Sequence, residues 1–418
     1  APRQSRSAGE VVWEGAPMAA VQHYYSELVC PCCRYCFKAV HGVRQSLELA
    51  LKLHGKSLAT HFPGAGELAS ELDEEIRERE EASAASGGGG GGGPVQCQRG
   101  CRAWFCGEEC LQRASARSSH LILCVELPEG KRQLVQKFWR YSRVKSESLW
   151  LGLLVYGEII SCVRHGLDLS SAMARFNFLS GSPQWQDMVE FDTEDPYKLA
   201  RIENYRDLRT QLLCESLSMV TEILSHHLAD FSPIFEPDYW SSLIGQFARV
   251  NMGLVVRHPL AKRVRRALEE QPRQQVTLAP LRAAFAAALR VMDGLREHDR
   301  ELSTFPYYES GYPSSDDSEE EDEEWALPGV EGVCLLRLTA LTNHSCAPNV
   351  RVDFPRGDWV AEARALRPLA AGEEVLQAYV DEDMDRKWRR KRLLLDYGFE
   401  CNCTKCEDEQ ALDVAADA

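Results

Sequence analysis

The spacing of the cysteines constrains what this chain can fold into more than any other feature of its sequence. Most of its sixteen cysteines lie in tight clusters, one to four residues apart, and four stand alone: Cys162, Cys214, Cys334 and Cys346. The N-terminal residues lack the apolar core of a signal peptide, so disulfides, which are rare in reducing compartments, are not expected. Clusters at these spacings are typical of zinc sites, whereas Cys162, Cys214 and Cys334 are expected to be buried thiols.

The middle cluster contains six residues of the types that bind zinc. They are Cys97, Cys101, Cys106, Cys110, His120 and Cys124. Because a zinc ion takes four ligands in a tetrahedron, two ions need eight, and the missing pair must come from the cluster at 30–36. Cys33 and Cys36 are the predicted pair, with Cys30 and Cys32 as the alternatives.

A third zinc site is predicted near the C-terminal end of the sequence. Cys401, Cys403 and Cys406 supply three ligands at close spacing, which leaves a tetrahedral site one ligand short. Cys346 is the candidate for the fourth ligand. Such an ion would be structural, because it would join two segments that lie far apart in the sequence.

The rest of the sequence divides into a helical block and a β-rich region. Between residues 133 and 300, apolar residues recur at helical spacing, and prolines separate the segments. Helices are expected at 134–165, 198–229, 237–256 and 279–300. After residue 330 the apolar residues alternate as they do in strands. Strands are expected at 10–14, 350–354, 359–366 and 374–379, and a basic helix at about 384–396.

Two segments of biased composition interrupt this pattern. Seven consecutive glycines at 87–93 follow a charged stretch, so about 62–95 is expected to be a disordered insertion within the zinc module. Residues 314–324 consist of serine, aspartate and glutamate, which is typical of a self-repelling loop. The sharper alternative for the acidic residues is a tether for basic, histone-like tails.

The charge and hydropathy of the chain argue against some classes of function. A net charge of −15 is unsuited to a broad nucleic-acid-binding surface, which needs a basic face, and it suits a protein that meets basic partners. The local basic patch of Arg99, Arg102, Arg113 and Arg117 allows at most weak DNA binding. No apolar run reaches the roughly 18 residues that a membrane span needs, so no membrane association is expected.

Three motifs follow one another in the last quarter of the sequence. Residues 343–349 read Asn-His-Ser-Cys-Ala-Pro-Asn, residues 372–379 begin with Gly-Glu-Glu-Val and end with Tyr, and residues 396–406 read Asp-Tyr-Gly-Phe-Glu-Cys-Asn-Cys-Thr-Lys-Cys. Together they resemble the signatures of the SET-and-MYND group of protein lysine methyltransferases. The segment 374–407 is most similar to the plant trithorax-related branch that carries a MYND finger, and the cysteine order at 97–124 resembles that finger.

The resemblance implies an α+β fold. In this fold a SET-type β-fold with a pseudoknot is interrupted by a MYND zinc finger and a helical insert, and a cysteine-rich post-SET segment closes it. The implied parts are an N-terminal SET segment at 1–29, a MYND-type finger at 30–124, a helical insert at 125–313, an acidic loop at 314–328, a core SET domain at 329–400, and a post-SET segment with a tail at 401–418.

The resemblance also implies how the zinc ligands are shared. One ion would be bound by Cys33, Cys36, Cys106 and Cys110. A second would be bound by Cys97, Cys101, His120 and Cys124. With the site of Cys346, Cys401, Cys403 and Cys406, three zinc ions are expected.

The implied activity is the transfer of a methyl group from S-adenosylmethionine to a lysine of a protein substrate, with histone tails among the candidate substrates. Tyr379 is implied as the catalytic residue, whose hydroxyl orients the amine and the methyl group. The implied cofactor contacts are Asn343, His344, Tyr379, Phe399, Tyr397 and Asn251. A role for His344 as a general base is not expected, because in the family it acts structurally.

Elementary chemistry agrees with such an enzyme. The attacking amine must be neutral, although a free lysine has a pKa of about 10.4. A narrow apolar channel lowers the pKa of the lysine by desolvating its ammonium group. Positioning and desolvation therefore carry most of the catalysis.

One element of the family pattern is absent from this sequence. The family has a Gly-x-Gly turn that contacts the cofactor, just ahead of the strand that residues 9–12 resemble, and the present sequence does not contain it. Weak binding of S-adenosylmethionine is therefore expected of the chain as it stands. The alternative function is a non-catalytic adaptor whose MYND finger binds proline-rich peptides and whose SET part is a scaffold. A monomer that works in the nucleus, on chromatin, or in the cytoplasm is expected in either case.

Overall fold

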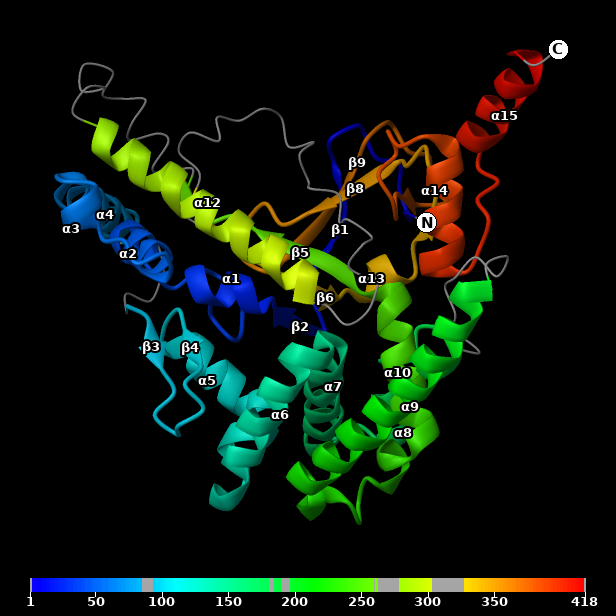
Figure 1. Cartoon of the computed structure of the whole chain (residues 1–418), viewed down its shortest axis with the longest axis horizontal. Coiled ribbons are helices and arrows are strands. Elements are labelled where there is room, and N and C mark those ends of the chain that lie inside the picture. Colours follow the sequence, from blue (N-terminus) through cyan, green and yellow to red (C-terminus); the bar gives the residue numbers. More distant parts are fainter. Residues whose placement is uncertain are drawn as a thin grey trace.

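The computed structural model describes residues 2–84, 93–179, 184–188, 196–258, 260–261, 278–302 and 327–416. Helices form two layers with short sheets between them, and the C-terminal helices lie at one end of the sheets (Figure 1). The predicted mixture of helices and sheets is confirmed. The acidic stretch at 314–324 and the glycine run, apart from Gly93, lie outside the described residues.

A three-stranded antiparallel sheet, here called the central sheet, has the strand order β2-β6-β5. Its strands are β2 (Ala19–Gln22), β5 (Met252–Val256) and β6 (Val330–Leu335). The middle strand approaches β2 closely at Gly332, where a Cβ atom would lie 2.1 Å from the carbonyl oxygen of Val21. Only a glycine fits at position 332, because the atom that an added Cβ would meet belongs to the backbone of β2 and cannot rotate away.

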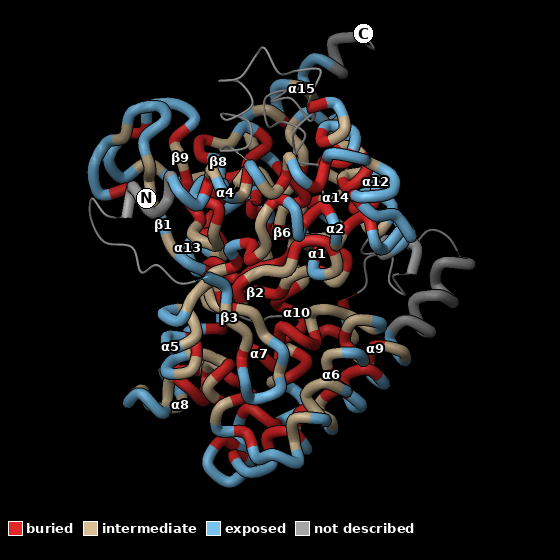
Figure 2. Tube along the Cα trace, turned by 90° about the vertical axis from the view of Figure 1, so that its left-hand side faces the viewer, coloured by how far each residue is buried: buried red, intermediate tan, exposed pale blue. Residues whose placement is uncertain are grey.

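The two faces of the central sheet belong to two different hydrophobic cores. Along β6, Val333 and Leu335 contribute to one core, whereas Cys334 and Leu336 contribute to the other. This division follows from the alternation of side chains along a strand. The central sheet is therefore buried on both faces, and β2 and β6 lie deep between the two helical layers (Figure 2).

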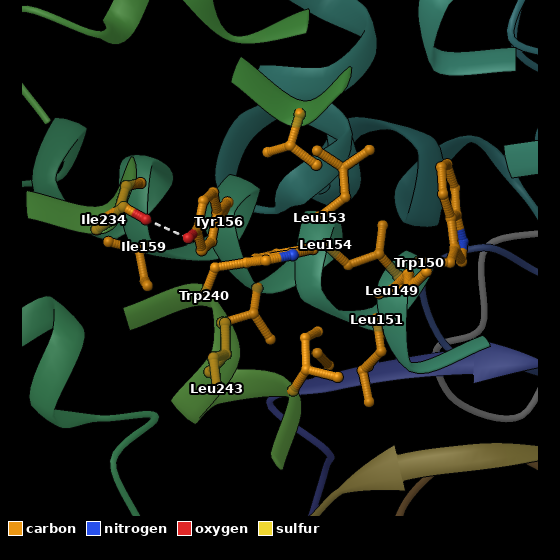
Figure 3. Packing of buried hydrophobic residues seen from close by; sticks show 14 of the residues in the cluster. Leu149, Trp150, Leu151, Leu153, Leu154, Tyr156, Ile159, Ile234, Trp240 and Leu243 are labelled. Atoms are coloured by element: carbon orange, nitrogen blue, oxygen red, sulfur yellow. Dashed lines mark hydrogen bonds between the residues drawn. The ribbon is translucent and has the colours of Figure 1, made fainter. Parts of the chain in front are cut away.

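The first helical layer is built around α7. The layer consists of α6 (Arg132–Lys145), α7 (Glu147–Arg164), α8 (Leu169–Ala174), α9 (Pro196–Ile223) and α10 (Pro237–Val250). Gly152 of α7 allows α10 to pack closely, since a Cβ atom there would lie 2.6 Å from the Trp240 ring. Figure 3 shows Trp240 and Tyr156 among leucines of α7, with the Tyr156 hydroxyl donating to the carbonyl of Ile234.

The second helical layer covers the opposite face of the central sheet. It consists of α1 (Tyr24–Val29), α2 (Val43–Leu53), α3 (Leu58–His61), α4 (Ala65–Ala84) and α12 (Ala279–Leu302). The helix α4 corrects the prediction of a disordered insertion over about 62–95. Leu72 and Ile76 are buried in the second core, and the Asp73 carboxylate accepts hydrogen bonds from the first backbone N–H groups of α2.

The C-terminal part of the chain adds two small sheets and four short helices. One sheet has the order β1-β9-β8, and the other pairs β7 with β10. The bounds are β1 (Val11–Gly15), β7 (Asn343–His344), β8 (Val350–Asp353), β9 (Ala361–Ala365), β10 (Leu376–Gln377), α13 (Arg337–Ala340), α14 (Arg386–Arg392), η9 (Leu393–Tyr397) and α15 (Thr404–Ala416). The strands predicted at 10–14, 350–354 and 359–366 are confirmed, and the one predicted at 374–379 is shorter than expected.

In sequence order, the cysteine-rich module follows α4 of the second helical layer and precedes α6 of the first. It comprises β3 (Val95–Gln96), β4 (Trp104–Phe105), α5 (Glu108–Arg117) and η1 (Leu121–Val125). The remaining short turns are η2 (Glu129–Lys131), η3 (Trp185–Asp187), η4 (Ser225–His227) and η5 (Ser232–Phe235). None of the described helices is both long and apolar enough to cross a membrane.

Two helices predicted in the helical block were wrong in part. The helix expected at 134–165 is two helices, because Ser146 has an extended backbone between α6 and α7. The helix expected at 237–256 ends at Val250, and the residues after it form β5 because they pair with β6. Of the lone cysteines, Cys334 is buried, Cys162 is half-buried, and Cys214 is exposed on α9.

We expect Gly332→Ala to destabilise the protein by about 2 kcal/mol, since the added methyl group meets a backbone carbonyl that cannot move freely. The matched control is Gly294→Ala on α12, where an added Cβ atom has nothing within 4 Å. This control should leave stability unchanged or raise it by up to about 1 kcal/mol, because alanine favours helix. Urea denaturation measures both changes, and equal midpoints for the two variants would contradict the close approach of β2 and β6.

Candidate active site and zinc centres

Two of the three motifs in the last quarter of the sequence lie side by side in the structure. The strand β7 at 343–344 pairs in parallel with β10 at 376–377. The pairing continues beyond the strands, because the N–H groups of Ser345 and Asn349 donate to the carbonyls of Gln377 and Leu376, at 2.9 and 3.0 Å. The segment that leads to Tyr379 is thereby held along the whole 343–349 motif.

Asn349 fixes this pairing from the inside. Its side chain is almost fully buried, its Oδ1 accepts from the N–H of Leu376 at 2.8 Å, and its Nδ2 donates to the carbonyl of Glu374 at 2.8 Å. Gln377 adds a second anchor, since its Nε2 donates to the carbonyl of Thr339 at 3.0 Å. No role was predicted for Asn349 or Gln377, although Asn349 ends the motif at 343–349.

Tyr379 follows directly on β10 and has its hydroxyl directed at the backbone. The hydroxyl donates to the carbonyl of Thr342 at 2.6 Å. The rings of Tyr397 and Phe399 lie at centroid distances of 4.7 and 6.4 Å from the Tyr379 ring. Burial raises the pKa of the Tyr379 phenol above its usual value, so the hydroxyl stays a neutral donor.

His344 uses both of its ring nitrogens within the protein. Its Nδ1 accepts a hydrogen bond from the N–H of Tyr379 at 3.0 Å, so the proton of the neutral ring belongs on Nε2. That nitrogen lies 3.3 Å from the sulfur of Cys346. Burial, and to a lesser extent the charge of Arg389, lowers the pKa of His344 to about 4. Both nitrogens being engaged, the ring has a positioning role and no nitrogen available for a substrate proton.

The remaining predicted cofactor residues differ in their placement. Asn343 is exposed, and its Nδ2 donates to Glu374 Oε1 at 2.8 Å. Tyr397 and Phe399 are half-buried beside Tyr379, so the aromatic cluster has an open side. Asn251 ends α10, and the structure does not bring its side chain into hydrogen-bonding contact with these groups.

The first cysteine group contains four sulfurs at distances that suit zinc. Its members are Cys33, Cys36, Cys106 and Cys110. The sulfurs of Cys36, Cys106 and Cys110 lie 3.5–3.8 Å from one another. Zinc–sulfur bonds of about 2.3 Å in a tetrahedron place sulfurs about 3.8 Å apart, so the group fits the ion. The alternatives Cys30 and Cys32 lie outside this group, and Cys30 packs into the second core.

The second group adds a histidine to three cysteines. Its members are Cys97, Cys101, His120 and Cys124. The sulfurs of Cys97 and Cys124 lie 3.8 Å apart. His120 Nε2 is buried and has no hydrogen-bond partner in the described part of the chain. A buried imidazole nitrogen without a protein partner, beside three thiols, fits the role of a zinc ligand.

The third group joins the 343–349 motif to the C-terminal segment. Its members are Cys346, Cys401, Cys403 and Cys406. The Cys346 sulfur lies 3.9 Å from that of Cys401 and 3.6 Å from that of Cys406. All the groups contain free cysteines, and the three of them fit three zinc ions, as the sequence predicts.

Arg389 is a buried cation beside this third group, and the sequence analysis missed it. Its guanidinium interacts with the sulfurs of Cys346 and Cys406, and it pairs with Glu409 of α15. Four thiolates around one zinc ion carry a net charge of about −2, so a buried cation next to them reduces the cost of burying that charge. The only sequence signal was its place in the basic segment 386–392.

Comparison with known proteins matches the part of the chain from α10 to Tyr379 with a known domain. A family model described as the SET domain matches residues 242–380. The histone-lysine N-methyltransferase ATXR2 of Arabidopsis thaliana is 22% identical over 96% of this chain and 86% of its own length. The N-lysine methyltransferase SMYD2-A of Xenopus laevis is 44% identical over 19% of this chain and 18% of its own. The protein-lysine N-trimethyltransferase SMYD5 of Mus musculus is 38% identical over 18% of this chain and 19% of its own.

The chain therefore carries a SET domain, and the predicted resemblance to SET-type lysine methyltransferases is confirmed. The matched residues include β7, β10 and Tyr379. They begin within α10, so the domain model takes in the strand β5 that the sequence analysis had placed in a helix.

We expect the purified protein to contain three zinc ions per chain, one for each group of ligands. Cys403→Ser should reduce this number by one, because a hydroxyl is a poor substitute for a thiolate. Cys214→Ser, which changes an exposed cysteine outside the groups, is the control and should leave the content unchanged. Elemental analysis of the desalted proteins measures the content, and an unchanged value for Cys403→Ser would contradict the third site.

Proposed function

We propose that this protein is an S-adenosylmethionine-dependent protein lysine N-methyltransferase. The observation that carries the proposal is the placement of Tyr379 in a matched SET domain. Its hydroxyl is fixed on the carbonyl of Thr342 at the crossing of the two motifs, beside a half-buried group of aromatic rings. A fixed hydroxyl in an aromatic surround is suited to positioning an amine for attack.

The residues around Tyr379 can prepare a lysine for this reaction. The rings of Tyr397 and Phe399 form apolar walls that would desolvate the ammonium group, lower the pKa of the lysine and so favour its neutral amine. The Tyr379 hydroxyl and the carbonyl of Thr342 offer polar atoms at one point of these walls. When bound, S-adenosylmethionine supplies a methyl group on a positively charged sulfonium.

The same cluster would also hold the methyl donor. Tyr379, Tyr397 and Phe399 suit a sulfonium, which has no N–H group that needs water, and its fixed positive charge beside the lysine would lower the pKa of the lysine further. Asn343 is exposed next to them and offers its amide oxygen, while the backbone of His344 is held by its pairing with Gln377. We propose Asn251, which directly follows α10 at the edge of the site, as a further contact of the cofactor.

For the domains, we propose a MYND-type finger at 30–124, with the first two zinc groups, and a post-SET segment at 401–418. The sharing of ligands between 33–36 and 106–110, and between 97–101 and 120–124, supports an interleaved finger. A helical insert at 125–313 and a core SET domain at 329–400 complete the arrangement. A role of the finger in binding proline-rich peptides is part of the proposal.

As substrate we propose a lysine on a basic protein segment, with histone tails as the first candidates. The plant relative that aligns with most of this chain is named a histone-lysine N-methyltransferase. The net charge of −15 favours association with such basic tails. We propose accordingly that the protein is a monomer and that it acts on chromatin in the nucleus.

The test is methyl transfer by the full-length protein from labelled S-adenosylmethionine to histones and cell extract. We expect Tyr379→Phe to lower the rate about 100-fold or more, because it removes one fixed hydroxyl from the reacting groups. The control is Tyr141→Phe, which removes a hydroxyl bonded to Glu215 on the first helical layer and should retain full activity.

Binding of S-adenosylmethionine by Tyr379→Phe, followed by calorimetry, shows whether the variant is folded. Unchanged labelling with this variant would rule out the role of Tyr379. A wild-type protein that binds proline-rich peptides and transfers no methyl group would favour the adaptor instead.

We expect loss of the third zinc ion to weaken S-adenosylmethionine binding. Cys346 holds the ring of His344, and His344 holds the backbone of Tyr379, so the ion supports the cofactor cluster. Calorimetry should show a lower affinity for Cys403→Ser than for wild type. Cys110→Ser, which damages a zinc group outside this cluster, is the control and should bind with wild-type affinity. Equal affinities for the two variants would contradict the coupling between the third zinc site and binding of S-adenosylmethionine.

A further inference from the structure

A hollow lined by aromatic and acidic side chains lies where α1 meets the junction of α6 and α7. Its aromatic members are Tyr24, Trp139 and Trp150, and its acidic members are Glu27 and Glu147. Figure 3 shows the Trp150 ring apart from Tyr156 and Trp240, at the edge of the first core to which it belongs, and the Arg34 guanidinium lies 5.5 Å from the centroid of this ring. Aromatic faces together with carboxylates form an environment for a cation.

The hollow already contains a cation from the same chain. The guanidinium of Arg143, in the last turn of α6, lies over the rings of both Tyr24 and Trp139. In the part of the chain that the structure describes, this guanidinium has no hydrogen bond and no ion pair. An arginine has five N–H donors. Arg143 therefore has a favourable cation–π interaction with the two rings, while its N–H groups hydrogen-bond only to water.

The two carboxylates of the hollow supply negative charge but little hydrogen-bonding capacity. Both oxygens of Glu147 are engaged, one by His23 Nδ1 at 2.6 Å and the other by the N–H of Tyr24 at 3.3 Å. Glu27 stands at the open side, and its carboxylate has no hydrogen-bond partner among the described residues. Partial burial raises the pKa of Glu27, while Arg34 and Arg143 oppose that shift.

We propose that this hollow is a binding site for a quaternary ammonium group, and that Arg143 is its internal plug. A trimethylated ammonium has no N–H donors, so it loses no hydrogen bonds when it replaces the guanidinium. It gains the faces of Tyr24 and Trp139 and the charges of Glu27 and Glu147. The source we assign to the group is a trimethylated lysine of a partner protein.

Displacement of the plug requires little change in the structure. Arg143 lies at the end of a helix, followed by an exposed residue, Val144, and its side chain has no polar contact to break. Rotation about its side-chain bonds moves the guanidinium into solvent. The hollow lies beside α1 and α6, on the far side of the central sheet region from α13 and α14, so it is separate from the Tyr379 site (Figure 1). The proposal therefore does not depend on methyl transfer.

The experiment measures the binding of tetramethylammonium to the full-length protein by calorimetry or saturation-transfer NMR. Arg143→Ala opens the hollow, and we expect it to bind the ion about fivefold more tightly than wild type. The matched control is Arg140→Ala, an exposed arginine on the same helix, which should bind as wild type does. Equal affinities for Arg143→Ala and Arg140→Ala would overturn the proposal.

Two further variants test the walls of the hollow in the Arg143→Ala background. Glu27→Gln keeps the shape of the side chain and removes its charge, and Trp139→Leu removes one aromatic face. Each should weaken tetramethylammonium binding by about fivefold or more. Trp388→Leu, which removes an exposed ring on α14, is the control for general effects of losing a tryptophan. Binding that survives both Glu27→Gln and Trp139→Leu would place the ion elsewhere and refute the site.

The source of the ammonium group is tested with two ligands of the same chemistry. A peptide that carries trimethyllysine should bind Arg143→Ala more tightly than the same peptide with unmodified lysine, and more tightly than choline. Tighter binding of choline, or no preference for the methylated peptide, would overturn the assignment to a protein side chain.

Discussion

The sulfur of Cys346 lies 3.9 Å from that of Cys401 and 3.6 Å from that of Cys406, and this contact holds the two halves of the candidate active site together. Two residues before Cys346, His344 links the Cys346 sulfur to the backbone of Tyr379. The phenol of Tyr379 is in turn fixed on Thr342. These contacts connect a cysteine group that fits a zinc ion to the hydroxyl of Tyr379, the residue that we propose for catalysis, and such supporting interactions behind a reacting group are common.

Most zinc ligands and several strands were predictable from the sequence because each depends on the spacing of residues that lie close together in the chain. A tetrahedral ion needs four ligands, so the counts at 97–124 and 401–406 called for two ligands from 30–36 and for one further ligand, for which Cys346 was the candidate. The structure brings Cys33, Cys36 and Cys346 to these groups and leaves Cys30 and Cys32 outside them. The alternation at 350–354 and 359–366 likewise predicted β8 and β9, since one face of that sheet is buried. The placement of Tyr379, next to Tyr397 and Phe399, followed the resemblance and not any local pattern.

The features that could not be predicted from the sequence depend on partners that are distant along the chain. The residues of β5 read as the end of a helix, and they are a strand because β6 pairs with them. The charged segment 65–84 read as disordered, yet it is a helix whose apolar side packs on α2 and α12. Arg389 looked like one more cation of a basic helix, and only its neighbours reveal it as the counter-charge of a cysteine group. In each case composition describes a residue's chemistry but not the surface that it meets.

The position of β6 between β2 and β5 has a consequence for synthesis on the ribosome. Tyr25, just after β2, hydrogen-bonds Glu331 of β6 across 306 positions of sequence. During translation, β2 and β5 must both wait with open edges until the strand between them emerges, and such exposed edges invite wrong pairing. Contacts at so large a separation also fold slowly. Nascent chains of this protein are therefore most vulnerable just before β6 leaves the exit tunnel, and a chaperone that shields β2 would act in that interval.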